Sequence, residues 1–112
     1  MRQMKRITVQ QVLDAYQQTG LSPIQRCHCA YFHGELVAAD ALNALLVSRG
    51  LGEQDTVNDI TRLLEIDRGY FWDFMYGYDG CDTRHSDSEG CKDGTAAYLA
   101  VFGGGNGTIE AE

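Results

Sequence analysis

The sequence has few of the features that would assign it to a special structural class. It contains one proline, Pro23, and one tryptophan, Trp72, among 112 residues. No apolar run reaches the roughly 18 residues that a membrane-spanning helix needs. Basic residues open the chain, but a polar amphipathic segment follows them where a secretory signal would have an apolar run. These absences predict a cytoplasmic protein that has no membrane partner.

Basic side chains are scarce in the second half of the chain. Residues 1–52 carry five basic and three acidic side chains, a balance of +2, whereas residues 53–112 carry four basic and thirteen acidic ones, a balance of −9. This asymmetry argues against binding to phosphate backbones, and therefore against a nucleic-acid partner. It suits a protein partner with a basic surface, although acidic side chains also keep a small protein soluble.

The length and the composition predict one compact domain. A chain of 112 residues with 44% apolar side chains can bury a core without disulfides. The sequence shows no internal repeat and no second domain. We expect an all-α fold of about five short helices over residues 1–103, followed by a flexible, Gly-rich and acidic tail over residues 104–112.

The central helix of this fold is expected over residues 35–49. Its apolar side chains cover most of a helical wheel, which is typical of a buried helix. The segment has no proline and no internal glycine, and Arg49 followed by Gly50 supplies a basic last turn and a C-terminal stop. Residues 21–33 follow neither a helical nor a strand period, so we expect a loop there, with at most a short extended piece.

Two other helices have clear start signals. Thr8 and Gln11 form a capping box for a helix that ends at Gly20. Either Asp55 or Thr56 caps a shorter helix whose apolar residues fall on one face. Both helices are expected to bury one face only.

The second half of the chain predicts an aromatic helix and a final helix. Asp67 caps the aromatic helix, which carries six of the eleven aromatic residues, and Asp93 caps a last helix over residues 94–102. Large rings need a shallow surface, so we expect the aromatic stripe to pack against the alanines of the central helix. The stripe consists of Phe71, Phe74, Met75 and Tyr78, and the alanines are Ala38, Ala41 and Ala44.

Four segments resemble those of a group of short, functionally uncharacterised bacterial proteins. They are VQQVLDAYQQTG at 9–20, ALNALL at 41–46, GYDG at 77–80 and DGTAA at 93–97. The resemblance implies a compact helical domain and no activity. The four cysteines are not a feature of that group, so their role is argued from chemistry alone.

Four cysteines and three histidines are the residues that suggest chemistry. A tetrahedral zinc site needs four soft ligands, which two cysteine-bearing loops would supply if they met in space. The alternatives are a disulfide, four free thiols, and a cysteine nucleophile with an imidazole partner. The candidate ligands of zinc, the one cofactor considered, are Cys27, Cys29, Cys81, His85 and Cys91.

The candidate partner-binding residues lie on and after the aromatic helix. Trp72 and Tyr76 fall partly off its apolar stripe and are of the types that anchor interfaces. We predict a small acidic interaction module that binds or inhibits a macromolecule, as immunity and inhibitor proteins do, with no catalytic residue assigned. A zinc-binding or thiol-based protein is the alternative. The candidate partner-binding residues are Trp72, Tyr76, Asp79, Asp82, Asp87 and Glu89.

Overall fold

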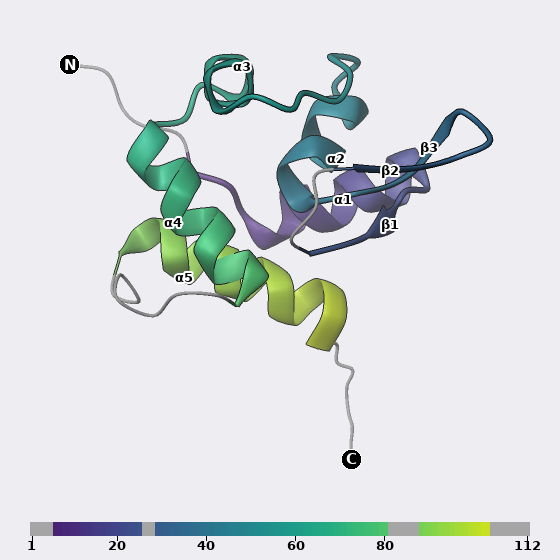
Figure 1. Ribbon diagram of the computed structural model, residues 1–112. Coiled ribbons are helices and arrows are strands. Elements are labelled where there is room, and N and C mark those ends of the chain that lie inside the picture. Colours follow the sequence, from purple (N-terminus) through teal and green to yellow (C-terminus); the bar gives the residue numbers. More distant parts are fainter. Residues whose placement is uncertain (1–5, 26–28, 81–87, 104–112) are drawn as a thin grey trace.

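The computed structural model describes residues 6–25, 29–80 and 88–103. Over these ranges the chain forms five α-helices, a closing π-helical segment and a three-stranded mixed sheet (Figure 1). The predicted tail, residues 104–112, lies outside the described residues. In chain order the elements are α1 (Val9–Thr19), β1 (Ser22–Pro23), β2 (Cys29–Phe32), β3 (Glu35–Ala39), α2 (Ala41–Ser48), α3 (Val57–Leu64), α4 (Arg68–Asp79), α5 (Glu89–Tyr98) and η1 (Leu99–Gly103).

The prediction of an all-α fold is wrong. The segment expected to open the central helix forms strand β3, and α2 begins only at Ala41. The helix begins there because the buried carboxylate of Asp40 accepts a hydrogen bond from the backbone N–H of Asn43, at 2.8 Å, and caps it. The predicted loop before it contains β1 and β2. In the sheet, β3 lies between its neighbours, parallel to β1 and antiparallel to β2.

A tight turn joins β2 to β3. His33 and Gly34 both have positive φ angles, 51° and 81°, as the two central residues of a type I′ turn do. This turn matches the right-handed twist of paired strands, so it brings Phe32 opposite Glu35. Figure 1 shows the resulting hairpin projecting away from α4 and α5.

The predicted starts of α1, α3 and α4 are confirmed. Thr8 and Gln11 exchange the two hydrogen bonds of a capping box, and α1 ends at Gly20 with a φ of 72°. Thr56, of the two residues considered, caps α3, and Asp67 caps α4. These signals are local, since each depends on one short polar side chain and the next turn of backbone.

The last helix begins earlier than predicted. Its cap is Ser88, whose hydroxyl accepts a hydrogen bond from the backbone N–H of Cys91 at 3.1 Å. Asp93, the expected cap, lies inside α5 and accepts hydrogen bonds from Arg6 instead. The helix therefore starts five residues before the predicted start at Gly94.

The aromatic helix α4 makes its closest helix–helix contact with α5, while its apolar stripe shares one buried core with Ala41 and Ala44 of α2. A Cβ atom added to Gly94 would stand 2.0 Å from the backbone oxygen of Phe74, and one added to Gly77 would stand 2.3 Å from that of Cys91. Gly90 is similarly close to the backbone of α4. Three glycines thus let the two helix backbones approach more closely than any side chain would permit.

One buried core joins all five helices. At its edge the hydroxyl of Tyr16 donates to the backbone oxygen of Ala39 at 2.8 Å, so the hydroxyl of Tyr78, 2.9 Å away, donates to Tyr16. Burial raises the pKa of both phenols, which are therefore neutral at physiological pH. No described helix is long and apolar enough to cross a membrane.

Candidate interaction site

A cavity of about 400 Å³ lies between strand β2 and the loop that precedes α3. Cys29 and Tyr31 come from the strand, where alternate residues share one face of the sheet. Glu53, Gln54 and Asp55 come from the loop, and none of the described residues that line the cavity is basic. Tyr31 and both carboxylates are exposed. The cavity is therefore open to solvent and acidic.

A hydrogen bond joins the two sides of this cavity. The hydroxyl of Tyr31 donates to the carboxylate of Glu53. This bond lowers the pKa of Glu53 below its ordinary value and raises the pKa of Tyr31 to about 12. At neutral pH the carboxylate is charged and the phenol is neutral, so the cavity presents negative charge beside an aromatic ring.

The thiol of Cys29 is held in its protonated form. Partial burial is the main cause that raises the pKa of Cys29, to about 11, and the nearby charges of Asp40, Glu53 and Asp55 add to it. A thiol is nucleophilic or metal-binding as the thiolate. Cys29 is thus poorly suited to nucleophilic catalysis.

The loop side of the cavity is fixed from the core. The side-chain oxygen of Asn43, a fully buried residue of α2, accepts a hydrogen bond from the backbone N–H of Gln54 at 2.7 Å. The nitrogen of the same amide is buried and has no hydrogen-bond partner among the described residues. Because Asn43 lies in a closely packed helix, this bond sets the position of the loop that carries both carboxylates.

Exposed apolar side chains extend the site along the hairpin. Phe32 is 65% exposed and Tyr31 is 54% exposed, and Val37 lies on the neighbouring strand with 40% of its surface exposed. The order β1-β3-β2 leaves β2 at an edge of the sheet as the described residues define it. We call Tyr31, Phe32, Val37, Glu53 and Asp55 the hairpin surface.

The sequence pattern did not identify this surface. Its residues come from two segments that the fold brings together, and one of them was predicted to be a loop and the start of a helix. The available signal was His33-Gly34 between the two short apolar segments at 29–32 and 35–39, a two-residue connection with one glycine.

The predicted partner-binding residues on α4 differ in their exposure to solvent. Trp72 is 43% exposed and Tyr76 is half-buried, and their ring centroids are 6.2 Å apart on one side of the helix. Asp79, at the end of α4, is half-buried. Asp82 and Asp87 lie outside the described residues.

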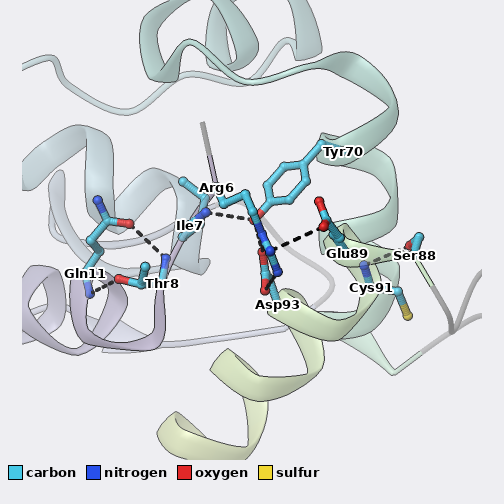
Figure 2. A network of polar contacts seen from close by, with 9 residues as sticks. All are labelled: Arg6, Ile7, Thr8, Gln11, Tyr70, Ser88, Glu89, Cys91 and Asp93. Carbon is cyan, nitrogen blue, oxygen red and sulfur yellow. Dashed lines mark hydrogen bonds and ion pairs between the residues drawn. The ribbon is translucent and has the colours of Figure 1, made fainter. Parts of the chain in front are cut away.

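Glu89, the remaining predicted partner-binding residue, is exposed and belongs to an intramolecular network of ion pairs and hydrogen bonds. Figure 2 shows Arg6 held between Glu89 and Asp93 of α5, with Tyr70 of α4 beside them. Arg6 donates to both oxygens of Asp93, at 3.0 and 2.8 Å, and lies 3.4 Å from Glu89. Tyr70 donates to Asp93 at 2.5 Å and accepts the backbone N–H of Ile7 at 2.7 Å. These groups attach the start of the chain to the helices, so their charges are already compensated.

The predicted zinc ligands are only partly described. Cys29 lies on β2 and Cys91 lies buried on α5, and both are free thiols. Cys27, Cys81 and His85 lie outside the described residues. Within the described ranges, no three His, Cys, Asp or Glu side chains form a group that would hold a metal ion.

Comparisons with protein families, with curated proteins and with solved structures found no match to this chain. Its function is therefore argued from the geometry and charge of its own surface.

Proposed function

We propose that this chain is a protein-interaction module that binds a basic surface of a macromolecular partner through the hairpin surface. The module binds or inhibits this partner, in the manner of immunity and inhibitor proteins. The site needs no catalytic group for this role, because its affinity comes from apolar contact, shape and charge.

The exposure of Tyr31 and Phe32 at the edge of the sheet supports this function most strongly. Each ring leaves more than half of its surface in water, although aromatic side chains of this size gain most when they are buried. Aromatic residues are enriched in the central parts of interfaces, where a few side chains supply most of the binding energy. A partner that covered the hairpin would remove this apolar surface from water.

The charge around these rings favours a basic partner. Glu35 faces Phe32 across the hairpin, and Glu53 and Asp55 lie on the adjoining loop. All three carboxylates are exposed. Complementary charge accelerates association and selects among partners more than it adds to affinity. We therefore expect the rings to supply most of the affinity and the carboxylates to supply most of the salt dependence.

Capture followed by a salt titration tests the function. The chain is immobilised, and proteins retained from a lysate of the source cells are identified and purified. The dissociation constant of each is then measured at 50 and 500 mM NaCl. We expect binding that weakens with salt, because screening acts on exposed charges. A partner whose affinity is the same at both salt concentrations would contradict the electrostatic part of the function.

A matched pair of variants locates the binding surface. Phe32→Ser removes the most exposed ring of the hairpin, whereas Leu99→Ser removes an apolar side chain of similar exposure, 56%, from η1. We expect Phe32→Ser to weaken binding about tenfold or more, as loss of an aromatic anchor does, and Leu99→Ser to leave it unchanged. Equal effects of the two variants would exclude the hairpin as the binding surface.

A further inference from the structure

The cavity beside β2 has the lining that a cationic side chain requires. One wall is the exposed ring of Tyr31, and the opposite wall carries the carboxylates of Glu53 and Asp55. Ammonium and guanidinium groups pair with carboxylates and are attracted to aromatic faces. No described residue lining the cavity supplies a positive charge of its own.

The size of the cavity agrees with this occupant. Its volume, about 400 Å³, lies near the lower limit of pockets that hold small ligands, which range from roughly 300 to 1,000 Å³. One long side chain with its adjoining backbone fits such a space. The thiol of Cys29 and the amide of Gln54 complete the lining with neutral groups, which would contact the methylene stem of the side chain.

Among the described residues, no ion pair joins the carboxylates of the cavity to a basic side chain, in contrast to other carboxylates of this protein. Asp93 and Glu89 face Arg6, and Asp59 pairs with Arg62 at 3.0 Å. Glu53 instead accepts a hydrogen bond from a neutral phenol, which holds the carboxylate in its charged form but leaves its charge in place. Burial is the main cause that raises the pKa of Cys29, and the charges of Asp40, Glu53 and Asp55 raise it further.

We propose that this cavity receives a lysine or arginine side chain of a protein partner, with its cationic head between Glu53 and Asp55 and its stem against Tyr31. This inference rests on the proposed interaction function and adds its chemical specificity. The occupant is a basic side chain of a partner that also contacts Phe32 on the same strand, so the partner is recognised by a cation together with an apolar contact.

A titration with single amino-acid analogues tests the cavity without knowledge of the partner. N-acetyl-lysine-methylamide and N-acetyl-arginine-methylamide are added to the isotope-labelled full chain, and backbone amide chemical shifts are followed. We expect saturable shifts in the millimolar range, confined to residues 29–31 and 53–55. The norleucine analogue, which has a similar stem and no charge, is expected to cause none. Shifts spread evenly over the acidic surface, or no shifts at all, would overturn the proposal.

Two double variants of equal charge provide the control. Glu53→Gln with Asp55→Asn removes both carboxylates of the cavity and is expected to weaken lysine binding about tenfold. Asp14→Asn with Asp73→Asn removes two charges elsewhere and is expected to leave binding within about twofold. If both double variants weaken binding equally, only the net charge matters and the cavity is not a site.

The cavity and the interaction function can fail separately. A captured partner whose affinity depends on Phe32 but not on Glu53 and Asp55 would overturn the cavity proposal and leave the interaction function standing. Saturable lysine binding, together with a partner that does not contact the hairpin surface, would support the cavity as a site and overturn the proposed interaction function.

Discussion

The helical part of this protein and its hairpin differ in how far their side chains are packed and their charges paired within the protein. In α4 and α5, glycines bring two backbones into contact, and the charges of Arg6, Glu89 and Asp93 compensate one another. In the hairpin, the side chains of Tyr31 and Phe32 are exposed to solvent, on a surface that also carries carboxylates. We therefore assign stability to the helices and recognition to the hairpin. Substitutions in the helices should lower the free energy of unfolding, and substitutions in the hairpin should weaken partner binding.

The largest effect is expected at the contact between α4 and α5. Gly94→Ala would place a methyl group 2.0 Å from the backbone oxygen of Phe74, and backbone cannot move aside as a flexible side chain does. We expect the free energy of unfolding to fall by about 3 kcal/mol or more, measured by urea denaturation. Gly103→Ala is the control, because its methyl group would meet only a side chain, at 3.4 Å. Equal stability of the two variants would show that the helices are not in close contact.

The next largest effect is kinetic and reports the burial of the Cys29 thiol beside the carboxylates of the cavity. The pKa of Cys29 is raised to about 11 from an ordinary 9.0, so the thiolate fraction at pH 8 falls about hundredfold. Alkylation of Cys29 in the folded chain, followed by peptide mass spectrometry, should be slower by about that factor than in the urea-denatured chain. The rate should rise as the pH approaches 11. Similar rates in folded and denatured chains at pH 8 would argue against a raised pKa and a partly buried thiol at Cys29.

A smaller loss of stability is expected at the network of Figure 2. Tyr70→Phe removes the hydroxyl that donates to Asp93 and accepts the N–H of Ile7, a buried group. Leaving that N–H without its acceptor should lower the free energy of unfolding by about 1–3 kcal/mol. Tyr76→Phe, on the outer side of the same helix, should change it by less than about 0.5 kcal/mol. The comparison of the two variants is made by thermal and urea denaturation.

The smallest effect on stability is expected in the hairpin. Phe32→Ser removes a ring that is 65% exposed, so the free energy of unfolding should change by less than about 0.5 kcal/mol. The same variant is expected to lose partner binding. A loss of stability comparable with that of Gly94→Ala would mean that the ring serves the fold, and the distinction between the two regions would no longer hold.

The parts of the fold that were predictable from sequence depend on local signals. The caps at Thr8, Thr56 and Asp67 were identified because each acts on its own first turn. Strand β3 was not, because its residues favour a helix and only pairing with β1 and β2 makes them a strand. Asp40, which separates the strand from the helix, is a short polar residue within an apolar run and was the available sign of the boundary.

The candidate site was less predictable than the fold. The exposure of Trp72 followed from helical spacing within one element. The hairpin surface combines residues of β2 with residues of a loop more than twenty positions later, such as Tyr31 with Glu53. No periodicity relates two such segments, and the loop is held by a hydrogen bond from Gln54 to Asn43, another residue distant in sequence from β2.

Amide hydrogen exchange of the chain, with and without a captured and purified partner, tests the central claim most directly. If the hairpin surface is the binding site, the partner should protect residues 29–37 and 53–55 and leave the outer side of α4 unchanged. Protection centred on Trp72 and Tyr76, with none in the hairpin, would contradict the assignment of recognition to this region.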